Sequence, residues 1–87
     1  MWIRPDEHKI VGSVLAEARQ RADLTQVELA KLLAKPQSFV SSYEAGQRRL
    51  DLLELIRIAD VLKADPVALA TEIIGVAKGQ GIQRNSG

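Results

Sequence analysis

Apolar residues recur every three or four positions through most of the chain, which is the spacing of one face of an α-helix. Helices are expected at about residues 6–22, 25–34, 36–45, 51–63 and 65–78. No stretch alternates apolar and polar residues as a half-buried β-strand does. The pattern therefore predicts an all-α fold, a compact five-helix bundle that occupies residues 6–78.

The two ends of the chain lack this pattern. Residues 1–5 are expected to form an N-terminal arm, in which Trp2 and Ile3 either pack against the bundle or contact a partner. Residues 79–87 are polar and glycine-rich, so we expect a flexible C-terminal tail from Gly79 onward.

Two helix starts are marked by capping boxes, in which two side chains satisfy backbone N–H groups that the first turn leaves free. Thr25 and Glu28 form one such pair, and Asp51 and Glu54 form the other. Between them, Pro36 favours the first turn of a new helix and excludes Lys35 from the preceding one. Residues 25–46 therefore read as two short helices separated by a break, at the spacing of a helix-turn-helix.

The second of these short helices has polar residues on its outer face and ends at Gly46, which suits the left-handed position after a helix. The polar residues are Gln37, Ser38, Ser41 and Ser42. They are poor helix formers by intrinsic propensity, and the helix has no evident need for them. They indicate either a surface that binds a ligand or a neutral, solvated face.

This stretch and its flanks resemble the Cro/repressor-type helix-turn-helix of the lambda-repressor-like, or XRE, family. The matching residues are Arg19, Leu24, Gln26, Leu29, Ala30, Leu33, Gln37, Ser38, Val40, Ser42, Glu44, Gly46, Leu55, Ala59 and Leu62. The resemblance implies a sequence-specific regulator of transcription, expected to be a repressor, whose third helix reads the major groove of DNA. The chain departs from the family pattern in the turn, where Ala34 replaces the usual Gly and Lys35-Pro36 replaces an apolar residue and a Ser or Thr cap.

The resemblance also implies a role for each polar residue. Residues expected to read base edges are Gln37, Ser38, Ser41 and Ser42, with Gln37 leading because glutamine can make a bidentate contact to adenine. Residues expected to contact phosphates are Gln26, Lys35, Arg48 and Arg49, with Gln26 also bracing Gln37. Arg19 and Glu44 are expected to form a structural ion pair that ties the first helix to the third and does not touch DNA.

The last two helices carry more apolar residues than one buried stripe requires. We expect a self-association face at Leu69, Ile73, Ile74 and Val76, with a long core helix as the alternative. A homodimer would read an inverted-repeat operator in double-stranded DNA, with two copies of the third helix about 34 Å apart.

Composition excludes several classes of protein. The 87 residues include no cysteine, which excludes disulfides and thiolate metal sites and agrees with a cytoplasmic protein. No segment resembles a signal peptide or a membrane span. His8 is the one histidine, and no nucleophile, carboxylate pair or phosphate-binding loop is evident, so we expect no enzyme, cofactor or metal.

Charge adds local information only. The formal net charge of +1 does not by itself indicate a nucleic-acid partner. Between residues 31 and 49, however, the basic residues Lys31, Lys35, Arg48 and Arg49 outnumber the single acid Glu44. Two alternatives to a regulator stay open: the antitoxin of a toxin–antitoxin pair, which would offer the fifth helix or the tail to a toxin, and a protein-interaction module that binds no DNA.

Overall fold

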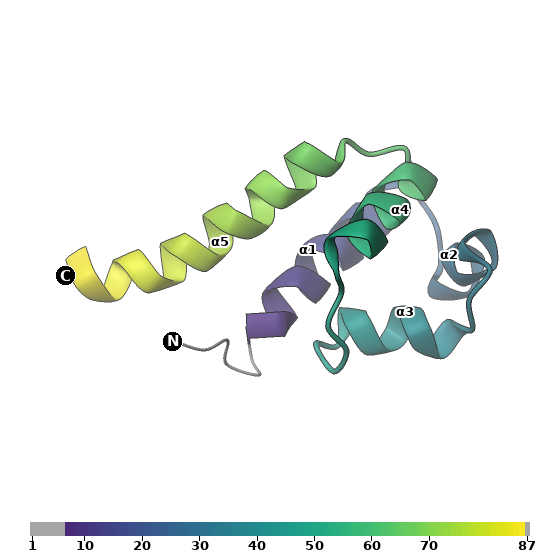
Figure 1. The fold of residues 1–87 in the computed structure, drawn as a ribbon, viewed down its shortest axis with the longest axis horizontal. Coiled ribbons are helices and arrows are strands. Elements are labelled where there is room, and N and C mark those ends of the chain that lie inside the picture. The colour runs from purple at the N-terminus through teal and green to yellow at the C-terminus, as the bar shows by residue number, and fades with distance from the viewer. Residues whose placement is uncertain (1–6, 87) are drawn as a thin grey trace.

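A computed structural model describes residues 7–86 and the side chains of residues 7–79, and Figure 1 shows its five helices. The helices are α1 (His8–Arg21), α2 (Gln26–Leu33), α3 (Gln37–Glu44), α4 (Leu52–Leu62) and α5 (Pro66–Ser86). The described residues contain no strand. The predicted all-α, five-helix fold is therefore confirmed, whereas the predicted arm at residues 1–5 lies outside the described residues.

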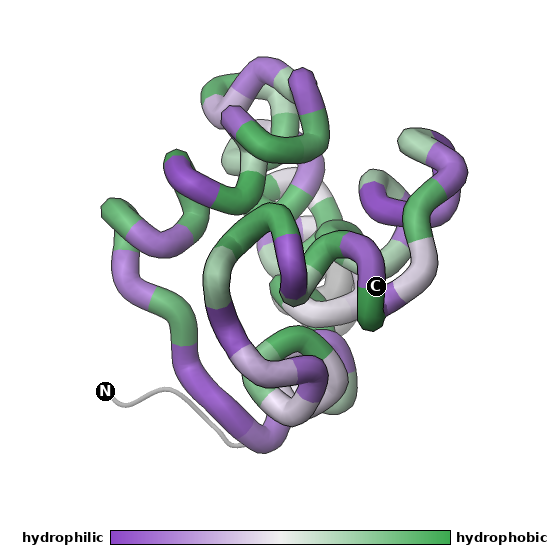
Figure 2. Tube along the Cα trace, turned by 90° about the vertical axis from the view of Figure 1, so that its right-hand side faces the viewer, coloured by the Kyte–Doolittle hydropathy of each residue, from purple (hydrophilic) through white to green (hydrophobic). Residues whose placement is uncertain are grey.

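One apolar core joins the five helices, because each of them contributes at least one buried side chain. The core residues are Val14, Leu15, Ala18, Leu29, Ala30, Leu33, Val40, Tyr43, Ile58, Ala59, Leu62 and Leu69. Burial of a Leu, Ile or Val side chain contributes about 1.5–3 kcal/mol to stability. Hydrophilic and hydrophobic residues follow one another in short runs along the helices (Figure 2).

Both predicted capping boxes are present. The Thr25 hydroxyl accepts the Glu28 N–H at 3.1 Å, while the Glu28 carboxylate accepts the Thr25 N–H at 2.8 Å. In the second box, the Asp51 carboxylate accepts the Glu54 N–H at 2.7 Å and the Glu54 carboxylate accepts the Asp51 N–H at 3.0 Å. These bonds fix the starts of α2 and α4, and through α2 they fix where the turn to α3 begins.

The turn between α2 and α3 contains no glycine, and Ala34 takes the left-handed conformation there, with φ 57° and ψ 43°. The Lys35 N–H donates to Ala30 O at 2.9 Å, which closes the end of α2. Pro36 is the N-cap of α3, in an extended conformation, one residue earlier than the first-turn position expected for it. The unusual sequence of the turn therefore still produces a sharp helix-turn-helix.

Gly12 allows α1 to contact the end of α3 directly. A Cβ atom at this position would lie 2.4 Å from the carbonyl oxygens of both Tyr43 and Glu44, which is closer than any side chain tolerates. In the sequence, Gly12 suggested only a small loss of helix propensity. The structure shows that the backbones of α1 and α3 meet where a side chain has no space.

Helix α5 differs from the prediction in its length. It continues to Ser86, past Gly79, where the sequence predicts that a flexible tail begins. Glycine lowers helix propensity, but unlike proline it does not remove a backbone donor, so Gly79 and Gly81 do not end the helix. The C-terminal half of α5 extends beyond the other four helices (Figure 1).

Replacement of Ala34 by Gly should stabilise the domain, because an L-residue in the left-handed region is strained and Gly is not. We expect a gain of about 1 kcal/mol after the greater backbone entropy of unfolded Gly is subtracted. Thermal unfolding followed by circular dichroism measures this gain. The matched control is Ala45→Gly at the end of α3, where φ is −81° and the same change should stabilise nothing; a loss of stability in Ala34→Gly would contradict the strain.

Candidate nucleic-acid interface

Helix α3 has one face in the core and the opposite face open to solvent. Val40 and Tyr43 are buried and anchor the helix between α1 and α2. The outer face carries the four polar residues singled out in the sequence: Gln37 and Ser38 are exposed, and Ser41 and Ser42 are half-buried. The Ser41 hydroxyl donates to Ser38 O at 3.3 Å, within the helix. The structure thus gathers all four predicted base-reading residues on one surface.

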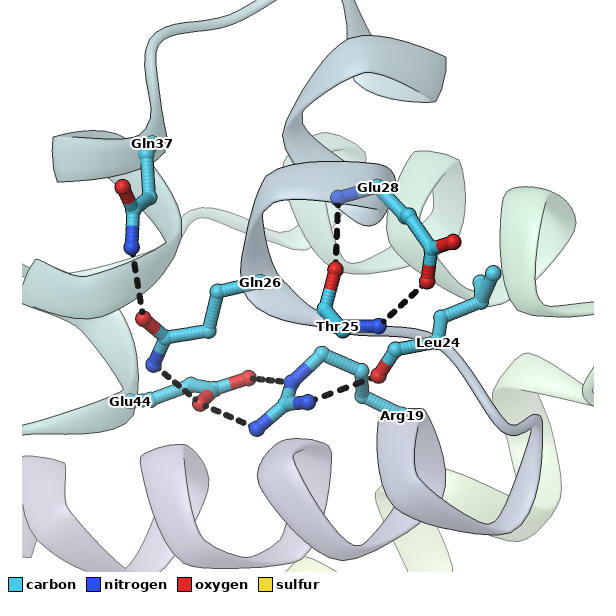
Figure 3. A network of polar contacts seen from close by, with 7 residues as sticks. All are labelled: Arg19, Leu24, Thr25, Gln26, Glu28, Gln37 and Glu44. Atoms are coloured by element: carbon cyan, nitrogen blue, oxygen red, sulfur yellow. Dashed lines mark hydrogen bonds and ion pairs between the residues drawn. The ribbon is translucent and has the colours of Figure 1, made fainter.

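Arg19 of α1 and Glu44 at the end of α3 form the ion pair that the sequence predicted (Figure 3). The guanidinium donates through Nε to Glu44 Oε2 at 2.8 Å and through Nη2 to Oε1 at 3.2 Å. A third bond, from Nη1 to Leu24 O at 2.7 Å, ties it to the segment before α2. The two side chains are only 12% and 7% exposed, and the hydrogen bond to Glu44 raises the pKa of Arg19 above its ordinary value.

A chain of side-chain hydrogen bonds continues from this pair to the beginning of α3. Gln26 Nε2 donates to Glu44 Oε1 at 2.9 Å, and Gln37 Nε2 donates to Gln26 Oε1 at 3.4 Å (Figure 3). The contact between the two glutamines, expected from the family resemblance, is therefore present. Gln37 gives one N–H to this chain of hydrogen bonds. Its amide oxygen has no partner among the described residues.

Tyr43 packs beneath this network without joining it. Its ring meets that of Phe39 edge-on, with centroids 5.4 Å apart. The hydroxyl is buried and makes no hydrogen bond within the described part of the chain. Burial raises the pKa of Tyr43 far above its ordinary value, so the phenol is neutral at every physiological pH.

The predicted phosphate-binding cations lie beside α3, but in different environments. Lys35 Nζ and Arg48 Cζ lie 5.5 and 4.8 Å from the Phe39 ring centroid, so the two cations flank one aromatic ring. Arg49 is exposed and has no hydrogen bond or ion pair to any described residue. Arg48, in contrast, donates to Glu54 of α4 at 2.6 Å, a contact that the sequence analysis missed because it treated Glu54 only as a helix cap.

The structure divides the predicted dimer face between two environments. Leu69 is 3% exposed and belongs to the core, so its assignment to a dimer face was wrong. Ile73 is half-buried and packs on the same core. Ile74 and Val76 remain 53% and 42% exposed. Spacing alone showed an excess of apolar residues on α5 and did not show which of them the core would cover.

In residues 7–86, no group of three or more His, Cys, Asp or Glu side chains is placed to hold a metal ion. None of the helices in that range is both long and apolar enough to span a membrane.

A short helix braced across a sharp turn, with a polar outer face and basic flanks, defines a helix-turn-helix domain. A family model described as helix-turn-helix matches residues 15–69, more than half of the chain. The chain belongs to the XRE family of helix-turn-helix proteins and is a DNA-binding transcriptional regulator.

Individual relatives agree with this assignment. The chain is 35% identical over 66 residues to the uncharacterized HTH-type transcriptional regulator y4dJ of Sinorhizobium fredii (strain NBRC 101917 / NGR234), covering 76% of this chain and 86% of that protein. An XRE-family like protein from Pseudomonas syringae pv. tomato str. DC3000 superposes with a TM-score of 0.71 at 38% identity, covering 80% of this chain and 85% of that one. The clp gene regulator ClgR from Corynebacterium glutamicum shares the fold, with a TM-score of 0.79 at 22% identity over 91% of this chain and 84% of that one.

Replacement of Glu44 by Ala should destabilise the domain strongly, because it leaves the shielded Arg19 charge without its partner. Breaking such a pair costs about 3–5 kcal/mol, and chemical denaturation measures the loss. The matched control is Glu72→Ala, which removes the exposed ion pair between Arg21 and Glu72 and should cost less than about 1 kcal/mol. Equal, small losses in both variants would show that the Arg19–Glu44 pair is not structurally important.

Proposed function

We propose that this protein is a sequence-specific repressor that lays α3 in the major groove of an operator and binds as a homodimer. The observation that carries the proposal is the bonded chain from Arg19 to Gln37, which holds a glutamine at the exposed start of α3 with its amide oxygen free. Repression requires only that the bound protein obstruct a promoter, so the DNA-binding surface is sufficient for it.

Gln37 has the chemistry to recognise adenine. A bidentate contact requires one acceptor for the adenine N6 amino group and one donor for N7. Gln37 retains both, since its oxygen is free and only one Nε2 hydrogen is used by Gln26. Ser38, Ser41 and Ser42 are short, so they let the helix approach closely and offer hydroxyl groups to neighbouring bases or phosphates.

The backbone contacts are proposed for Gln26, Lys35, Arg48 and Arg49, on either side of the reading face. Glu44 is the one acid between residues 31 and 49, and its carboxylate is occupied by Arg19 and Gln26. The charges left at the surface of this segment are therefore basic. Such cations release counter-ions from DNA and supply affinity that falls with salt, without reading sequence.

For the dimer we propose the exposed part of α5, with Ile74 and Val76 as its apolar contacts. These side chains are about half exposed in the described chain, on the helix that extends beyond the other four (Figure 1). A two-fold pairing would place two copies of α3 in successive major grooves, about 34 Å apart, over an inverted repeat. The same projecting helix supports a second candidate, an antitoxin that uses α5 to hold a toxin and α3 to bind its own promoter.

Truncation of Gln37 to Ala should weaken operator binding by about 1–3 kcal/mol and relax specificity at one base pair. Arg49→Ala should weaken binding to every sequence and lower the slope of log K against log salt by about 0.9. Fluorescence anisotropy measures both effects, with an operator selected from random duplexes and with its single-base-pair variants. Lys63→Ala, at the exposed end of α4 and outside both proposed surfaces, is the control that should change neither; equal weakening across all sequences in Gln37→Ala would exclude base reading by Gln37.

Replacement of Ile74 by Asp should convert the dimer into monomers, because a charge on an apolar contact cannot be buried without a partner. Sedimentation velocity distinguishes the two states. Leu53→Asp is the matched control, since Leu53 is an exposed apolar residue of α4 and its change should leave the dimer intact. If Leu53→Asp gave monomers and Ile74→Asp stayed dimeric, the dimer interface would lie on α4 and not on α5.

A further inference from the structure

We propose that Glu54 is a built-in counter-ion for Arg48, and that it weakens the contact of Arg48 with DNA phosphates until a phosphate takes its place. Glu54 would thereby set how tightly the regulator holds DNA of any sequence. This inference rests on the proposed DNA-binding role of the surface beside α3.

The pair of oxygens on Glu54 serves two different partners. Oε1 accepts the Asp51 N–H at 3.0 Å as part of the capping box of α4, and Oε2 accepts Arg48 Nη2 at 2.6 Å. Because the cap holds the carboxylate at the first turn of α4, Glu54 cannot leave when DNA arrives. The guanidinium, on a flexible side chain, is the partner free to move.

Phe39 packs against the other side of the Arg48 guanidinium. The Arg48 Cζ atom lies 4.8 Å from the Phe39 ring centroid, so the guanidinium is held between a ring of α3 and a carboxylate of α4. Lys35 approaches the same ring, with Nζ 5.5 Å from the centroid. Two cations thus converge on one flank of α3, and one of them already carries an anion.

The charge of Glu54 matters because affinity for DNA comes largely from cations that replace condensed counter-ions. When Arg48 binds a phosphate, it must give up the Glu54 carboxylate. Arg48 therefore contributes less to the affinity for DNA than an unpaired arginine does. Arg49, which has no ionic partner among the described residues, provides that comparison within the same loop. Base preference is unaffected, because neither partner of the pair lies on the outer face of α3.

The capping role and the counter-ion role can be separated by one substitution. Glutamine at the third helical position completes a capping box as glutamate does, so Glu54→Gln keeps the cap and removes the charge. Glu28 occupies the equivalent position in the capping box of α2 and has no arginine partner among the described side chains. Glu28→Gln is therefore a matched control for the loss of one negative charge near DNA.

The test is a double-mutant cycle read by fluorescence anisotropy over a salt series. Wild type, Glu54→Gln, Arg48→Gln and the double variant are titrated with the selected operator and with an unrelated duplex of about 20 base pairs. We expect Glu54→Gln to tighten binding to both duplexes about two- to fivefold, the range of an exposed ion pair, and to steepen the salt dependence. Glu28→Gln should give a smaller gain, and when Arg48 is already Gln the gain from Glu54→Gln should fall to that smaller value.

Several results would overturn the counter-ion role. These are unchanged or weaker binding in Glu54→Gln, an equal gain in the Arg48→Gln background, or an equal gain from Glu28→Gln. A thermal melt of Glu54→Gln should match wild type, which confirms that the cap persists. If wild type binds DNA and the cycle shows no coupling, only this inference fails; if none of the variants binds either duplex, the proposed DNA-binding function fails with it.

Discussion

The position of α3 depends on the shielded ion pair between Arg19 and Glu44. The pair joins the first helix to the end of the third, and the bond from Arg19 to Leu24 O adds the start of α2 to the same junction. Hydrogen bonds in a shielded site are stronger than at an open surface, because water competes for them less. Helices α1, α2 and α3 therefore meet at one guanidinium, and the orientation of α3 is set from inside the bundle.

The structure also shows that opposite charges near α3 are used in two ways. Arg19 and Glu44 are nearly inaccessible, so that pair has a mechanical role. Arg48 and Glu54 are 42% and 28% exposed, so that pair can exchange partners with an external anion. The formal net charge hides this distinction. Which cations are available to DNA follows from burial and pairing, and a count of basic residues does not reveal it.

Much of the fold was predictable because its determinants are local. Both capping boxes, the break before Pro36 and the five helices follow from residues a few positions apart, and the Arg19–Glu44 pair came from the family resemblance. Two misses are tertiary: Gly12 is required by backbone atoms of Tyr43 and Glu44 in another helix, and Leu69 is covered by the core. Spacing along one helix shows neither of them. The continuation of α5 past Gly79 has a local cause, because glycine lowers helix propensity without ending a helix.

The close contact at Gly12 has a consequence for how such a protein can change its target. Helix α3 is held by Val40, Tyr43, Glu44 and the backbone of α1, all of which lie on its inner side. The outer side chains contribute almost nothing to that attachment, apart from the 3.4 Å bond of Gln37. The residues facing outward can therefore be exchanged with little effect on folding, and under the proposed reading role of α3 such exchanges would change the operator while the scaffold stays the same.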